Sequence, residues 1–266
     1  MKFQNHHREE YCSVTSASLR MEKVSVVFDD RTLLKDIDIE VGANKSLVLV
    51  GPSGHGKSTL LRIFAGLQPP TTGKVYIEGQ NLYDLPDVDR KKLILKMGML
   101  FQKNALFDSL TVGENVTFPL EEVTDCDSKE ILHRRDYFLE AVGLAASRDL
   151  FPNEISGGMQ KRLGIARALA LYPEIVFYDD PTAGLDPITS RKIIDLIKEM
   201  QSKKSSTLVA VTNEMARAYQ LEGDIAMVVD QEVIVTGNRE QTLKHSDPRV
   251  HQFVRGAIEG PLLEGP

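Results

Sequence analysis

Nine consecutive residues constrain what this chain can fold into more than any other part of it. The first eight match the pattern G-x-x-x-x-G-K-[ST], and the nine are Gly51, Pro52, Ser53, Gly54, His55, Gly56, Lys57, Ser58 and Thr59. An apolar run, Ser46–Val50, precedes them, and a helical pattern, Lys57–Ala65, follows and is closed by Gly66. Strand, glycine loop and helix in this order form the context in which the pattern binds phosphate.

The chemistry of this loop follows from its residue types. Glycines let successive backbone N–H groups converge on an anion, and the N-terminus of the helix adds partial positive charge. Lys57 can then reach the β- and γ-phosphates of a nucleotide, and the Ser58 hydroxyl can ligate Mg²⁺. The alternative is a glycine-rich turn that matches by chance, because short motifs carry a risk of false positives. The other motifs of the chain have to decide between the two.

Composition excludes several other classes of protein. Of the 266 residues, 42% are hydrophobic and 26% are charged, as in an ordinary globular protein and unlike a disordered one. A net charge of −6 gives no indication of a nucleic-acid partner. The apolar runs are far shorter than the roughly 20 residues of a membrane-spanning helix. Cys12 and Cys126 lack metal or disulfide spacing, and the polar N-terminus lacks a secretory apolar region, so we expect a reducing, cytosolic compartment.

The periodicity predicts one α/β domain with a polar tail before it and an extension after it. We expect the tail at 1–19, with His6 and His7 solvated, the domain at 20–240 and the extension at 241–266. Strands are predicted at 24–28, 33–41, 46–50, 75–77, 97–101, 175–178, 207–212, 225–230 and 232–236. Helices are predicted at 57–65, 87–96, 112–118, 128–142, 163–171, 188–201 and 214–221, with Ser128 as a candidate N-cap. A region with little strand pattern, about 103–160, predicts a helical subdomain.

Two acidic residues follow an apolar strand. Asp179 and Asp180 come directly after Ile175–Tyr178, at the carboxyl end where open α/β sheets bind ligands. Asp179 can hold the Mg²⁺ that Ser58 also contacts, and Asp180 can orient an attacking water. The alternative is that both acids only stabilise the helix starts that follow them.

Two further features admit a structural and a functional interpretation. Ser156, Gly157 and Gly158 begin an alanine-rich helix and could form a second anion cradle, although a simple N-cap would look the same. Phe28 ends the first predicted strand and could be a core aromatic or a platform for an adenine ring. From these residues alone, the N-cap and the core aromatic are favoured.

The order of the motifs resembles the nucleotide-binding subunit of ABC transporters. The phosphate loop, Gln102 after a strand, the Ser156–Gly158 helix start, the paired acids and then Ala183–Asp186 follow one another as they do in that family, from Val24 to about Gly237. The resemblance implies an α/β fold with a P-loop NTPase (RecA-like) core, an antiparallel β subdomain and a helical insertion. It also implies an ATP hydrolase with ATP and Mg²⁺ as cofactors.

The resemblance assigns a role to each matching position. Residues 51–59 match the Walker A loop, Phe28 the aromatic that stacks on adenine, Gln102 the Q-loop that senses Mg²⁺ and the γ-phosphate, Asp179 the Walker B acid, and 183–186 the D-loop of the dimer interface. Ser156, Gly157 and Gly158 match the signature motif, which grips the γ-phosphate of the ATP bound to the other subunit. The implied working unit is a head-to-tail dimer with two ATP molecules between its subunits.

Two positions depart from the family pattern. The acid after the Walker B aspartate is usually Glu, and here it is Asp180, whose carboxylate falls short by roughly a bond length, on the order of 1.5 Å. The switch histidine is replaced by Asn213, which can donate an N–H but cannot carry charge. Since phosphoryl transfer depends on positioning and charge stabilisation, we expect slow but real hydrolysis.

The C-terminal residues look like the tail of the Mla/Mce-type ATPases, which energise lipid movement between the inner and outer membranes of diderm bacteria. The matching segments are 246–253, Gly256 and 259–261, together with 180–188. The resemblance implies a transmembrane permease, a second ATPase subunit (most simply a copy of this chain), an MCE-type substrate-binding protein and a peripheral place at the cytoplasmic face of the inner membrane.

Three alternatives remain open. Amino-acid and methionine importers share most of the core motifs, so their ATPase subunits are the next candidates. Asp180 and Asn213 also fit a regulatory subunit that binds ATP and hardly hydrolyses it. A soluble ABC ATPase without a membrane partner is disfavoured, because the chain has one cassette only.

Overall fold

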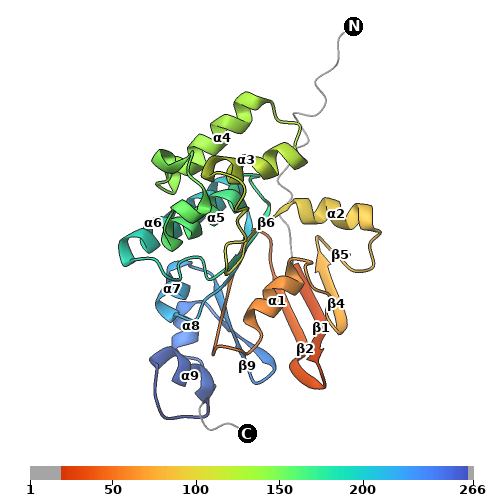
Figure 1. Ribbon diagram of the computed structural model, residues 1–266. Helices are drawn as coiled ribbons and strands as arrows, with labels where there is room; N and C mark the ends of the chain where they lie inside the picture. The colour runs from red at the N-terminus through yellow and green to blue at the C-terminus, as the bar shows by residue number, and fades with distance from the viewer. Residues whose placement is uncertain (1–18, 263–266) are drawn as a thin grey trace.

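The computed structural model describes residues 19–262, which form two β-sheets and several helices, with the smaller sheet at the edge of the molecule (Figure 1). The larger sheet has the strand order β10 (Glu232–Gly237), β9 (Asp224–Val229), β3 (Ser46–Val50), β8 (Thr207–Val211), β7 (Ile175–Asp179) and β6 (Met97–Leu100). Its neighbouring strands are parallel except for the β9–β10 hairpin. The smaller sheet is antiparallel, in the order β2 (Arg31–Val41), β1 (Leu19–Phe28), β4 (Thr72–Ile77) and β5 (Gln80–Asn81).

The central strands of the larger sheet are apolar because both of their faces are covered. Every residue of β3, β7 and β8 is buried, which is typical of parallel strands between helical layers. Since β8 lies between β3 and β7, the segments that follow these three strands meet at one edge of the sheet. The phosphate loop, Asp180 and Asn213 are in those segments.

The helices divide the molecule into two packed cores. Helix α1 (Lys57–Phe64) contributes Leu60, Leu61, Ile63 and Phe64 to a core shared by both sheets, so it lies between them. The other face of the larger sheet is covered by a second core. The remaining α-helices are α2 (Asp87–Leu95), α3 (Val112–Val123), α4 (Ser128–Ala141), α5 (Gly157–Leu169), α6 (Pro187–Lys204), α7 (Met215–Gln220), α8 (Arg239–Leu243) and α9 (Pro248–Arg255). None of the helices in residues 19–262 is long and apolar enough to cross a membrane.

The predicted fold class is present in the structure. Between β6 and β7 the chain forms only helices, turns and loops, and α3, α4 and α5 lie together at one end of the molecule, away from the antiparallel sheet (Figure 1). The smaller sheet shows the expected alternation, with Leu34, Ile37, Ile39 and Val41 buried and charged residues between them. The limits predicted for the domain and its extension stay predictions.

Several local predictions were wrong, and three of them have a clear physical reason. The first strand begins at Leu19, not at Val24. The prediction missed its first residues because a bulge at Lys23 turns two successive side chains outward and breaks the alternation. The N-cap of α4 is Asp127 and not Ser128, since the Asp127 carboxylate accepts a hydrogen bond from the backbone N–H of Glu130. Phe28 is 49% exposed and is therefore not a core aromatic. His6, His7 and Cys12 lie outside the described residues.

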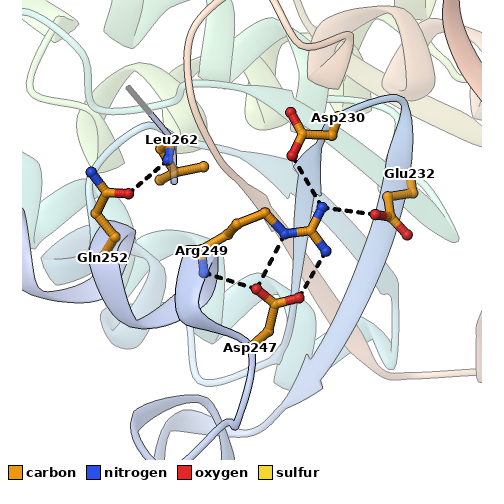
Figure 2. Close-up of polar contacts among 6 residues, drawn as sticks. All are labelled: Asp230, Glu232, Asp247, Arg249, Gln252 and Leu262. Carbon is orange, nitrogen blue, oxygen red and sulfur yellow. Dashed lines mark hydrogen bonds and ion pairs between the residues drawn. The ribbon is translucent and has the colours of Figure 1, made fainter. Parts of the chain in front are cut away.

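The C-terminal segment is tied to the larger sheet by one arginine (Figure 2). Arg249 of α9 contacts Asp247 at its own N-cap and reaches Asp230 (3.0 Å) and Glu232 (2.8 Å) at the β9–β10 turn. The hydrogen bonds to these carboxylates raise the pKa of Arg249 further above its usual range. Gln252 accepts a hydrogen bond from the backbone N–H of Leu262, which folds the last described residues back onto α9.

Candidate functional site: a nucleotide cradle at the sheet edge

The loop between β3 and α1 has a backbone that requires glycine. Gly51, Gly54 and Gly56 have φ angles of 133°, 84° and 98°. A Cβ atom at Gly51 would lie 2.3 Å from the carbonyl oxygen of Val228, so no other residue fits without displacing the loop. The first turn of α1 contains no acidic residue, so nothing opposes an anion at this helix N-terminus. The loop is therefore built around its glycines, and the helix N-terminus behind it carries no opposing negative charge.

Lys57 is folded under this loop. Its side chain is 6% exposed, and its Nζ donates hydrogen bonds to the carbonyl oxygens of Gly51 (2.8 Å) and Pro52 (2.7 Å). These bonds use two of the three donors of the ammonium group. Burial lowers the pKa of Lys57 to about 8, although the nearby carboxylates of Asp179 and Asp180 act in the opposite direction. A bound anion would favour the charged form further.

Ser58 and Asp179 are brought together as the sequence predicts. The Ser58 hydroxyl donates to Asp179 Oδ1 at 2.9 Å, across 121 residues of sequence, and Asp179 is 3% exposed. A hydroxyl and a carboxylate are hard oxygen donors, which suit Mg²⁺ held together with nucleotide phosphates. No group of three or more His, Cys, Asp or Glu side chains within residues 19–262 could hold a metal ion by itself. Ser58 and Asp179 therefore fit a Mg²⁺ ion that is also coordinated by nucleotide phosphates, and not a site made of protein side chains alone.

Asp180 points into a charged surrounding next to this pair. Its backbone is left-handed, with φ of 52°, and its N–H donates to the carbonyl oxygen of Val211 at 3.0 Å. Its carboxylate lies 3.4 Å from Arg217 Nη1, and both side chains are 19% exposed. Burial raises the pKa of Asp180, whereas Arg217 and Lys161 lower it.

Sequence reasoning missed these two cations. Lys161 of α5 is 5% exposed, and its Nζ donates to the carbonyl oxygen of Gln102 at 3.4 Å. Burial lowers the pKa of Lys161, and the two acids oppose that shift. A lysine in an alanine-rich, buried helix is a usable sequence signal, because such a charge needs a partner. Arg217 gives no such signal, since a short surface helix carries arginine routinely.

Other predicted residues lie at the surface and are not joined to the cradle. Phe28, Gln102 and Asn213 are exposed, as are Ser156 and Gly157. The Ser156 hydroxyl accepts a hydrogen bond from the backbone N–H of Met159 at 3.3 Å, so its N-cap role is confirmed. A Cβ atom at Gly157 would meet nothing within 4 Å. The start of α5 is therefore an open helix N-terminus on the outside of this chain.

A comparison with protein families decides the class. The model of the family described as ABC transporter matches residues 34–183, which include the phosphate loop, the α5 start and both acids. The chain belongs to the ABC transporter family. As an ABC ATPase it binds and hydrolyses ATP, and the resemblance inferred from the order of its motifs is confirmed.

Curated relatives of this ABC ATPase include phospholipid-transport proteins. It is 36% identical over 233 residues to the intermembrane phospholipid transport system ATP-binding protein MlaF of Haemophilus influenzae, covering 88% of each chain. It is 35% identical to MlaF of Escherichia coli, covering 91% of this chain and 90% of that one. It is also 33% identical to a probable ribonucleotide transport ATP-binding protein, mkl, of Mycobacterium leprae, covering 92% of this chain and 71% of the other.

Solved structures with the same fold include ABC cassettes that form dimers. A post-hydrolysis dimer of the ATP-binding cassette MJ0796, bound to ADP and Pi, matches with a TM-score of 0.75 and 33% identity, over 81% of this ABC ATPase and 96% of that chain. A second dimeric structure of MJ0796 gives a TM-score of 0.76 at the same identity and coverage. The predicted fold class is confirmed.

Proposed function

We propose that this ABC ATPase is the ATP-hydrolysing subunit of a lipid-transporting complex of the Mla/Mce type. The observation that carries the proposal is the 35–36% identity to MlaF proteins over about nine-tenths of both chains. In that setting the subunit lies on the cytoplasmic face of the inner membrane of a diderm bacterium. Its partners are a transmembrane permease, a second ATPase subunit and an MCE-type substrate-binding protein.

The geometry of the cradle supports a specific placement of ATP. The phosphates lie against residues 51–56 and the start of α1, with Lys57 between the loop and the paired acids. Ser58 and Asp179 would hold Mg²⁺, and Gln102, which is exposed in the loop after β6, would join them only when a nucleotide and the ion are bound. Bound there, Mg²⁺ would supply charge neutralisation for phosphoryl transfer. Phe28, half exposed at the end of β1, offers a ring face for the adenine.

The exposed start of α5 supports a site completed by a second subunit. Ser156, Gly157 and Gly158 present a capped, uncovered helix N-terminus, which is suited to an anion that another chain carries. Each copy then contributes a phosphate loop to one ATP and a signature segment to the other. The dimeric MJ0796 structures, at 33% identity, agree with this arrangement.

Slow hydrolysis follows from the two unusual positions. Asp180 orients the attacking water from a shorter side chain than the usual Glu, and Asn213 supplies an uncharged donor in place of histidine. A misplacement of about 1 Å can cost on the order of a hundredfold in rate. A second candidate function, a regulatory ATP-binding subunit, is favoured by the same two substitutions.

The test is to purify the tagged chain from its native membranes in mild detergent and to identify what accompanies it. A multi-spanning permease with an MCE-type protein and phospholipid supports the proposal. A solute-binding protein instead of these indicates an importer, and a second, different ATPase subunit indicates the regulatory function. No membrane partner at all would contradict a transport role of any kind.

A further inference from the structure

The carboxylate of Asp180 faces a cation that none of the motifs assigns. Arg217 Nη1 lies 3.4 Å from Asp180 Oδ1, and both side chains are four-fifths buried. The two residues come from different elements: Asp180 follows β7, and Arg217 belongs to α7. The pair therefore exists only because β7 and β8 are neighbours in the sheet and α7 follows β8.

The guanidinium of Arg217 is fixed from a second side. Its Nε lies 3.0 Å from Glu214 Oε2, one helical turn earlier, while Nη1 points at Asp180. The next residue, Ala218, is fully buried, which anchors this turn of α7 in the core. An arginine held between two carboxylates has little rotamer freedom left, so it can hold the second carboxylate in one orientation.

Asp180 needs such a partner more than a glutamate would. Its side chain is one methylene shorter than that of a glutamate, so its carboxylate cannot make up for a wrong orientation by extending farther, and its backbone is left-handed. The other charged groups around it are Lys161 of α5, Lys57 of α1, Glu214 at the N-cap of α7 and Asp179 at the end of β7. Of the three cations, Arg217, Lys161 and Lys57, Arg217 is the one whose contact with the carboxylate is direct. Asn213, four residues before Arg217, is exposed and has no charge to offer.

We propose that Arg217 is a positioning residue for ATP hydrolysis: it holds the Asp180 carboxylate where it binds the attacking water. Arg217 lies about one helical turn farther along the chain than Asn213. Its positive charge beside Asp180 compensates for the missing charge at Asn213. The inference rests on the role proposed above for Asp180. Two other interpretations make different predictions: a latch that holds Asp180 away from water, and a purely structural ion pair.

The test is a double-mutant cycle in the full-length chain, assayed alone and with its membrane partners. Arg217→Gln should lower kcat for MgATP by about tenfold or more while KM changes less than about twofold, because a displaced carboxylate affects the transition state and not nucleotide binding. Arg217→Lys should recover part of the loss. Asp180→Asn should lower kcat by itself, and Arg217→Gln should then add nothing. The matched control is Arg191→Gln, which removes an exposed arginine paired with Asp195.

A second readout does not depend on turnover. In thermal unfolding of the nucleotide-free chain, the effects of Asp180→Asn and Arg217→Gln should be non-additive, as expected for residues in contact. Faster turnover of Arg217→Gln would establish a latch, and unchanged kcat with a lowered melting temperature would establish a structural pair; either result overturns the proposal. Full turnover of Asp180→Asn would refute the role of Asp180 itself, and the inference with it.

Discussion

Replacing Gly51 with alanine tests the nucleotide cradle most sharply, because the structure gives the size of the perturbation. The new Cβ would lie 2.3 Å from the carbonyl oxygen of Val228, so the loop or β9 has to move by about 1 Å to reach an ordinary contact. Left-handed backbone costs about 1–2 kcal/mol and overpacking about 1–3 kcal/mol. We therefore expect Gly51→Ala to lower the melting temperature by on the order of 10 °C.

The functional effect should be larger than the loss of stability explains. A shift of about 1 Å in the N–H groups that surround the phosphates should weaken ATP binding more than about tenfold and lower kcat/KM by on the order of a hundredfold. Gly73→Ala is the matched control. Gly73 also has a positive φ, and its Cβ would meet the carbonyl oxygen of Lys23 at 2.3 Å, but it lies in the antiparallel sheet. This variant should lose at least as much stability and keep its ATP affinity.

Titration calorimetry with MgATP, below the melting temperature of each variant, separates the two effects. If Gly51→Ala does not fold, Gly54→Ala replaces it, because a Cβ atom there meets nothing within 4 Å and only backbone strain is added. Wild-type ATP affinity in a folded Gly51→Ala variant would show that residues 51–56 do not hold the phosphates. An equal loss of affinity in Gly73→Ala would show that the loss is not specific to this loop.

Further outcomes follow from other parts of the structure. Asn115→Ala should lower the melting temperature by roughly 6–12 °C in calorimetry, because the fully buried amide bonds three carbonyl groups and one N–H, and their loss costs on the order of 3 kcal/mol. Asp180→Glu combined with Asn213→His should raise ATP turnover, and an unchanged kcat would show that neither position limits it. The side-chain hydrogen bond from Arg249 lowers the pKa of Asp247. The stabilisation that this pair gives to the folded protein is therefore complete above about pH 4 and is lost as the pH falls below it. After correction for intrinsic rates, hydrogen exchange of residues 247–262 should therefore become faster as the pH is lowered from 6 to 3. In Arg249→Ala the same exchange should already be faster at neutral pH. Unchanged exchange in that variant would show that Arg249 does not hold the segment.

Much of the nucleotide cradle could be predicted because it is local in sequence. The run from Ser46 to Phe64 specifies a buried strand, a glycine loop and a helix within about twenty residues, and β3 and α1 form at the predicted places. The pairing of Ser58 with Asp179 is not local. It was still predictable, because parallel strands place their carboxyl ends at one edge of a sheet.

Apart from Lys161, the parts that were missed depend on contacts that leave no local pattern. The contact between Asp180 and Arg217 spans 37 residues and arises from the strand order, which periodicity does not specify. The bulge at Lys23 hid the start of β1, since pattern reading assumes strict alternation. The exposure of Phe28 could not be read either, because an aromatic at a strand end looks the same whether it is covered or open to solvent.

One measurement tests the central claim, that ATP binds between the phosphate loop of one copy and the α5 start of another. The molecular mass of the full-length Asp180→Asn variant would be determined by light scattering with and without MgATP. We expect a change from the 29.6 kDa monomer to twice that mass on adding MgATP, and no change when Ser156→Arg is introduced as well. A monomer at saturating MgATP, or a dimer that Ser156→Arg leaves intact, would contradict it.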